Sequence, residues 1–241
     1  MESNAFNFNS FVEDSKQTLF NPREYFSTLS TEGGLGIPVL KAVLYGAVAG
    51  IFHLLWSILN LTYAGGAMGG MFGGAVGVLA FFGSIVAALI GLFLGAVIIL
   101  LLVAIAGGKT DFEPIVHVSA ALLVIMPVSA FLNVFAGFHW FLGALISLAV
   151  NLYALWLLFN AMTAALGSKT ETSKIIVYVL AGLFILFFFI GLGTRRASRN
   201  FMREFEQHNM DLGERGVEQK SPPLCNSTHN YFMDVYNRLN I

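Results

Sequence analysis

A few ionisable residues have types that could hold a metal ion or move a proton. Glu113 and His117 stand four residues apart, so a helix would place both on one face. Together with His53 and His139 they would supply carboxylate and imidazole groups, which suit transition metals. No spacing among the four matches a recognised ligand motif. We therefore expect structural histidines, hydrogen-bonded or at an interface, and no metal or other cofactor.

Two glycine-containing stretches raise the question of phosphate binding. TYAGGAMGGMFGGAVG, residues 62–77, holds seven glycines but no lysine, and a phosphate loop needs a lysine after its last glycine. AIAGGKT, residues 104–110, ends in Gly-Lys-Thr, but Val103 stands where the leading glycine should be, and an apolar helix replaces the required strand. We expect no nucleotide binding at either stretch.

The chain also lacks the usual arrangements for nucleophilic or metal-assisted catalysis. Its serines are not set in a nucleophile elbow, and no His-Glu-x-x-His occurs. Without convergent titratable groups, we expect no catalytic residues and no enzyme activity.

The elements that carry these residues are predicted to lie in a membrane. Of the 241 residues, 56% are hydrophobic and 11% are charged, whereas soluble domains are about 25% charged. No Asp, Glu, Lys or Arg occurs from Ala42 to Gly108. Hydrocarbon offers no water to the backbone, so such a run must form helices or be buried in protein. We expect an all-α, polytopic transmembrane bundle whose first partner is the lipid bilayer. The net charge of −1 gives no sign of a nucleic acid partner.

Hydropathy and length predict about five membrane spans. Each needs to cross roughly 30 Å at about 1.5 Å per residue. Four clear candidates are Pro38–Leu61, Glu113–Phe135, His139–Leu166 and Lys174–Thr194. Residues 64–108 are less clear. One span, Gly83–Ala106, preceded by a glycine-rich helix or re-entrant piece, is favoured over two spans because no polar turn divides the stretch.

The two ends of the chain are predicted to be amphipathic and interfacial. Residues 1–37 form an N-terminal interfacial or cytosolic segment, in which Phe11, Val12, Leu19 and Phe20 alternate with charged residues. A second short helix is expected to restart at NPREYF, residues 21–26. Residues 38–194 form the membrane domain, and residues 195–241 form a basic helix and a polar tail. Four arginines of this tail are expected to contact lipid head groups or a partner: Arg195, Arg196, Arg199 and Arg203.

A row of small and polar residues follows one face of the first span. Gly46, Gly50, His53, Ser57 and Asn60 are spaced 4-3-4-3, which keeps them on one side of a helix. In lipid, small residues let helix backbones approach, so this face should point into the protein. Polar groups at membrane depth are also costly and often functional. We interpret the row as a packing seam, with a substrate path as the alternative.

Other residues of the same kind occur in the later spans. Gly143, Ser147 and Asn151 share a face of the span His139–Leu166, which we expect to pack against the seam of the first span. Pro127 falls in mid-span and should kink its helix. The complete set for the packing seam or path is Gly46, Gly50, His53, Ser57, Asn60, His117, Pro127, Asn133, Ser147 and Asn151.

Three stretches together resemble the Ypt-interacting-protein (Yip) domain family. They are LFNPREYFSTLSTEGGLGIPVLKAVLYGAVAG (19–50), AIAGGKTDFEPIVHVSAALLVIMPVSA (104–130), and LYALWLLFNAMTAAL (152–166) followed by SKTETSKIIVYVL (168–180). The resemblance covers about Phe20 to Arg196. It implies five spans, a cytosolic N-terminus and no enzyme activity. Eukaryotic relatives bind prenylated Rab-type GTPases. This chain has a shorter leader and a longer tail, so no residue is assigned to a GTPase contact, and a bacterial member in the inner membrane is favoured over an endomembrane protein.

The favoured function is therefore a non-enzymatic membrane adaptor or scaffold that binds other membrane proteins, or a second copy of itself, or organises the bilayer. The alternative is a small-molecule or ion transporter or channel that uses the polar row. Five spans also place the arginine cluster after Thr194 on the side opposite the N-terminus, against the usual cytosolic bias of basic residues. Two spans within residues 64–108 would remove that conflict.

Overall fold

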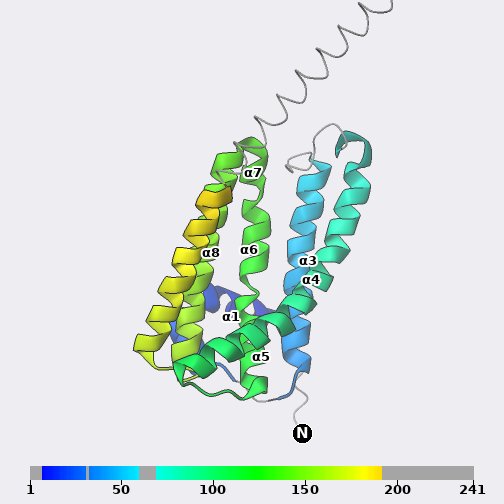
Figure 1. The fold of residues 1–241 in the computed structure, drawn as a ribbon. Coiled ribbons are helices and arrows are strands. Elements are labelled where there is room, and N and C mark those ends of the chain that lie inside the picture. The colour runs from blue at the N-terminus through cyan, green and yellow to red at the C-terminus, as the bar shows by residue number, and fades with distance from the viewer. Residues whose placement is uncertain (1–6, 31–32, 60–68, 192–241) are drawn as a thin grey trace, which may run out of the picture. The chain divides into compact units, whose positions relative to one another are not determined.

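The computed structural model describes residues 7–30, 33–59 and 69–191, and within them every regular element is helical (Figure 1). In chain order the labelled helices are α1 (Phe8–Phe20), α2 (Pro22–Thr28), α3 (Gly36–Ile58), α4 (Gly69–Ala106), α5 (Phe112–Leu122), α6 (Ile125–Leu132), α7 (Val134–Phe138) and α8 (Trp140–Asn160). A π-helical turn, Ala161–Ala165, continues α8, and a last helix covers Thr170–Gly191. The chain divides into two units after Phe188, and the packing described below is that of the first.

Five stretches of the described residues are long and apolar enough to cross a membrane. They are Gly36–Ile58, Gly77–Ala106, Phe112–Phe138, Phe141–Ala165 and Thr170–Gly191. The predicted five-span helix bundle is confirmed. The six-span alternative is wrong, because Gly69–Ala106 is one continuous helix. Residues 60–68, including Asn60, and the predicted arginine cluster at residues 195–203 lie outside the described residues.

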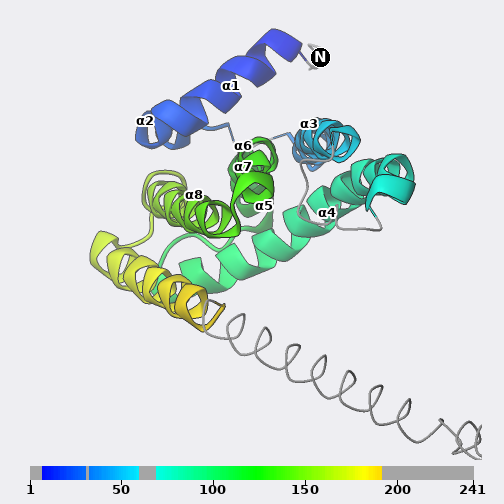
Figure 2. The same cartoon turned by 90° about the horizontal axis from the view of Figure 1, so that it is seen from above.

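The glycine-rich stretch is helical from Gly69 onward, which confirms the glycine-rich helix and leaves no re-entrant piece in that range. With 38 residues, α4 is about 57 Å long at 1.5 Å per residue, well beyond the hydrocarbon thickness. It fits by bending: its first part runs beside α3, and its second part crosses toward the start of the last helix (Figures 1 and 2).

The span Phe112–Phe138 is interrupted between α5 and α6. Pro127 has no N–H to donate to the carbonyl of Leu123, four residues earlier. That carbonyl instead accepts from Met126 N–H at 2.9 Å, and Val124 N–H donates to Ala121 at 3.2 Å. These tighter bonds mark the break, so the kink predicted from Pro127 is confirmed.

The seam of the first span packs closely, and its partner is α4. A Cβ built on Gly46 would lie 2.8 Å from Ile85 Cα, and one on Gly50 would lie 2.5 Å from Ser84 Oγ. The Ser84 hydroxyl donates to the Gly46 carbonyl at 2.8 Å. Further along the same contact, a Cβ on Gly77 would lie 3.1 Å from Ser57 Cβ. The interface therefore has no room for larger side chains.

The expected pairing of this seam with the span His139–Leu166 is wrong. A Cβ on Gly143 would lie 2.5 Å from Ala136 of α7, so that glycine accommodates the helix immediately before it in the chain. The α3 glycines instead meet Ser84, Ile85 and Ala88 of α4.

The tightest core lies at the end of the bundle that carries α2. Side chains from α2, α4, α5 and the π-helical turn meet there and are almost inaccessible; among the largest are Phe26, Leu92, Ile115, Val116, Met162 and Leu166. Ser119 of α5 donates its hydroxyl to the Leu92 carbonyl of α4 at 2.8 Å. By contrast, the apolar side chains of the last helix are exposed or half-buried, and Tyr178 and Val179 are among the exposed ones. A bundle with such an outer surface needs lipid around it.

Two similar turns meet at this end. GGKT (107–110) follows α4, and GSKT (167–170) follows the π-helical turn. Each begins with a glycine in the left-handed region, with φ of 69° at Gly107 and 62° at Gly167, a conformation that suits glycine. The backbone of Lys109 donates to the Leu166 carbonyl at 2.9 Å, and that of Lys169 donates to the Ala106 carbonyl at 3.1 Å. This reciprocal pair fixes both turns at the same end of the bundle.

Candidate functional site

The first helix, α1, has three faces with different surroundings. Phe11 and Thr18 are 7% and 1% exposed and face the bundle. About 60° to 100° further round the helix, at 100° per residue, lie Phe8 and Val12, which are 63% and 49% exposed. Its third side carries exposed polar residues, including Glu13. A helix at a membrane interface requires these three faces: one that contacts the protein, an apolar one that contacts lipid and a polar one that contacts water.

Aromatic contacts hold α1 and α2 against the spans. The rings of Phe11 and Tyr45 are 4.8 Å apart between centroids, and Phe26 is 1% exposed. The Tyr153 hydroxyl of α8 donates to the carbonyl of Leu19 at the end of α1. Viewed along the bundle, α1 and α2 run across one side of the spans (Figure 2). The helix pair is therefore a docked part of the bundle.

A polar cavity of about 450 Å³ lies beneath this helix pair. It is lined by α1 and α2 and by α3 and α5. Its polar and charged lining comprises Asn7, Ser10, Asp14, Gln17, Tyr25, Thr28, Ser30, Lys41 and His117. We take this cavity and the helix pair above it as the candidate functional site.

An ion pair inside the cavity joins α1 to α3. Lys41 Nζ lies 2.7 Å from Asp14 Oδ2, with the two side chains 13% and 38% exposed. Lys41 also donates to the Tyr25 hydroxyl at 3.4 Å. Beside this pair, the hydroxyls of Ser15 and Tyr45 lie 2.8 Å apart. A lysine this buried requires its anionic partner, because an unpaired buried charge is costly.

Tyr25 is held in its neutral form. Burial raises the pKa of its phenol above the ordinary value of 10.0, and the nearby Asp14 carboxylate acts in the same direction. A neutral phenol keeps its proton, and its oxygen accepts from Lys41.

Glu113 and His117 act together on the loop that joins α2 to α3. Glu113 Oε1 accepts from the Gly34 N–H at 2.6 Å, and His117 Nε2 lies 3.1 Å from the Gly34 carbonyl. Because a carbonyl only accepts, His117 Nε2 carries the proton in this contact. Gly34 has a φ of 79°, which its lack of a side chain permits. His117 is thus hydrogen-bonded, as predicted, and the pair anchors the loop.

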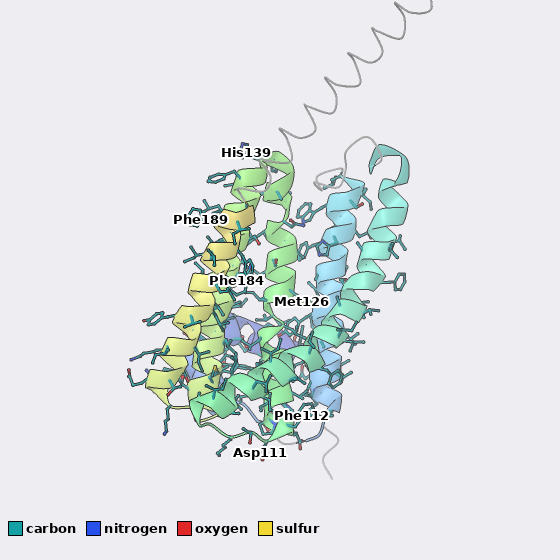
Figure 3. All side chains as sticks on the ribbon, viewed as in Figure 1. Asp111, Phe112, Met126, His139, Phe184 and Phe189 are labelled. Atoms are coloured by element: carbon teal, nitrogen blue, oxygen red, sulfur yellow. The ribbon has the colours of Figure 1, made fainter. Side chains whose placement is uncertain are left out.

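His53, His117 and His139 do not come together with Glu113 in one site. Within the described residues, no group of three or more His, Cys, Asp or Glu side chains is arranged to hold a metal ion. Asp111, which precedes the helix of His117, lies at one end of the bundle, and His139 lies at the other (Figure 3). His53 is partly buried on α3 and does not line the cavity.

The remaining residues of the predicted path are also dispersed. Asn133 and Ser147 are exposed, and Asn151 donates to the Ser147 carbonyl of its own helix at 2.7 Å. Pro127 is partly buried at its kink. Of the nine predicted residues that the structure describes, only His117 lines the cavity. Gly46, Gly50 and Ser57 pack α3 on α4, and His53 and Pro127 are half-buried elsewhere.

Sequence reasoning missed the charged residues that organise this cavity. Lys41 is the only charged residue within the span Gly36–Ile58, and it stands close to the start of that helix. That isolated charge was a usable signal that a counter-ion must lie nearby. The choice of Asp14, 27 residues away, depends on how α1 folds back and could not be read from spacing.

Comparison with known proteins gave one family. The model of the Yip1 domain matches residues 16–193, which is most of the membrane domain together with α2 and part of α1. No curated protein and no solved structure gave a match.

Proposed function

This chain belongs to the Yip1 domain family and is an integral, multi-pass membrane protein, and on that premise we propose that it is a non-enzymatic adaptor. In this proposal the N-terminal helix pair faces the cytosol at the membrane interface and presents its polar side, with the cavity behind it, to a partner protein. The membrane is the inner membrane of a bacterium. The partner is another membrane-associated protein, and no GTPase-binding residue is assigned.

The observation that carries the proposal is the docked state of α1. Its bundle-facing side is fixed by Phe11, by the ion pair of Asp14 with Lys41, and by Thr18. That anchoring leaves Glu13 and Gln17 exposed on a rigid polar row. A helix held in this way loses little conformational entropy when it binds, which favours a recognition role.

Transport is the less supported function. It would need polar groups gathered along a route through the spans, but the predicted path residues are dispersed. The polar cavity lies at the end of the bundle occupied by α1, α2 and the start of α3.

The test compares two charge reversals in the full chain, purified from its own membranes in a gentle detergent. Glu13→Lys changes the polar row of α1, and Asp111→Lys makes the same charge change at an exposed site outside that row. We expect a stoichiometric partner to copurify with the wild-type chain and with Asp111→Lys, and to be lost with Glu13→Lys.

Two results would contradict the adaptor function. One is the absence of any stoichiometric partner from the wild-type preparation and from membranes cross-linked before solubilisation. The other is solute flux through proteoliposomes that contain the purified chain alone, which would favour the transporter.

A further inference from the structure

A second cavity lies on the other side of α2 from the polar cavity. It has a volume of about 350 Å³. Arg23 contributes from α2, and Thr170 and Lys174 contribute from the first turns of the last helix. Phe159 and Asn160 at the end of α8 form the wall between them. Three elements that are distant in sequence thus converge around one small space.

The charged residues that line this cavity are basic. Among the residues that the structure describes, Arg23 and Lys174 are its ionisable lining residues, and no carboxylate is part of the lining. Within the described part of the chain, Arg23 has no ion pair. Lys174 pairs with Glu171 at 3.0 Å, but the two side chains are 44% and 84% exposed. An exposed pair of this kind contributes little and is easily exchanged for another anion.

The polar groups of the cavity fit a phosphate. Arginine binds phosphate oxygens through two parallel N–H groups, and lysine acts as a mobile point charge. The Thr170 hydroxyl adds a neutral donor. Thr163 also lines the cavity, but its hydroxyl already donates to the Phe159 carbonyl at 2.9 Å, so it is not counted among the donors.

The position of the cavity indicates where the phosphate comes from. Thr170 is the first residue of a membrane span, so the cavity lies at the depth where that span meets the lipid head groups. The ring of Phe159 and the methyl group of Ala164 give it an apolar wall, which suits the glycerol and first acyl carbons of a lipid. Basic pockets between transmembrane helices commonly bind anionic head groups.

We propose that the cavity formed by Arg23, Thr170 and Lys174 binds the phosphate of an anionic phospholipid. The bound lipid would bridge α2 to the last helix and so join the N-terminal helix pair to the most exposed span of the bundle. This site is separate from the polar cavity of Asp14 and Lys41 and does not depend on the adaptor function.

The experiment uses the full-length chain in detergent, with lipid binding followed by native mass spectrometry. The probes are phosphatidylglycerol, zwitterionic phosphatidylcholine and inorganic phosphate. Arg23→Gln, Lys174→Gln and the double variant are compared with Lys109→Gln and Lys169→Gln, which neutralise exposed lysines at the same end outside the cavity. We expect preferential binding of phosphatidylglycerol, weakened about fivefold by each cavity substitution and unchanged by the controls.

Three results would overturn the proposal. Equal binding of phosphatidylcholine would show that the site does not recognise an anionic lipid. Unchanged phosphatidylglycerol binding by the double variant would place the lipid elsewhere. Displacement of the lipid by millimolar inorganic phosphate would assign the cavity to a soluble phosphate. Because the substituted side chains lie at the surface of the fold, we expect every variant to keep its helical circular dichroism, and Arg23→Lys should retain intermediate affinity.

Discussion

Gly46 and Gly50 show how a single atom can decide the packing of two spans. Neither residue has an unusual backbone, and each is constrained by what lies opposite it on α4. Lys41, by contrast, depends on its close neighbour: its buried charge is tolerated because Asp14 lies 2.7 Å away. At the residue scale, the structure therefore depends on contacts that the chain makes across long sequence separations.

The glycine seam makes a direct prediction. Gly46→Leu should destabilise the protein by about 1–3 kcal/mol, because the new side chain meets the backbone of Ile85, which cannot give way cheaply. Gly83→Leu is the matched control, since Gly83 is exposed and a Cβ there would have nothing within 4 Å. Thermal unfolding in detergent should show a loss for the first variant and none for the second. Equal behaviour of the two would contradict the seam.

Removing one partner of the Asp14–Lys41 ion pair should cost more stability than removing the other. Asp14→Asn should destabilise more than Lys41→Met, because it leaves the more buried charge without its counter-ion. The loss should be about 1–3 kcal/mol. The double variant Asp14→Asn/Lys41→Met should recover part of it. Denaturant unfolding of the four proteins forms a complete cycle, and additive effects would show that the two residues do not interact.

The raised pKa of Tyr25 predicts that the stability of the folded chain falls at alkaline pH. Its pKa is raised in the folded chain from an ordinary 10.0, so the unfolded chain loses this proton first as the pH rises. The contribution to stability is therefore complete below about pH 10 and is lost progressively above it. Melting temperatures from pH 8 to 11 should fall more steeply for the wild-type chain than for Tyr25→Phe. Parallel curves would count against a buried neutral phenol.

The helices differ in how well the sequence predicts them. The five spans were predictable because each is a local run of apolar residues, and the kink followed from the covalent structure of Pro127. The partner of the α3 seam was not predictable, because Gly143, Ser147 and Asn151 also place small residues on one helix face, whereas the true contact on α4 includes the large Phe81 and Ile85. The cavity was missed because its ion pair joins α1 to α3. Only the folded arrangement of these helices, not their periodicity, brings Asp14 to Lys41.

The interrupted span gives a prediction at this scale. Pro127→Ala would supply an N–H for the Leu123 carbonyl and should allow α5 and α6 to join into one straighter helix. Spin labels at the exposed positions Phe112 and Phe138 should then report a longer end-to-end distance by pulsed electron resonance. An unchanged distance would mean that packing around the break, rather than the proline, sets the bend.

The three faces of α1 can be distinguished by their surroundings. A tryptophan placed at Val12 should be quenched by lipids with brominated chains, since that side is exposed and apolar, whereas one at Glu13 should be quenched by aqueous iodide. Both substitutions replace exposed side chains, so the fold should tolerate them. Quenching of both positions by the same agent would contradict an interfacial helix.

The described bundle as a whole combines a tight core at one end with spans that expose apolar surface along much of their length. That end holds the N-terminal helix pair, the polar cavity, the basic cavity and the two paired turns after α4 and the π-helical turn. The adaptor function and the lipid site both rely on this asymmetry, because both require these features to face the same side of the membrane.

The most direct test of this arrangement is the accessibility of single cysteines in intact membranes, on a background in which the lone Cys225 is replaced by serine. An impermeant maleimide should label positions 13, 111 and 171 from one side of the membrane and position 138 from the other. Labelling of positions 111 and 171 from opposite sides, or of position 13 from the side of position 138, would contradict a five-span bundle with its N-terminal helices docked at the end of the paired turns.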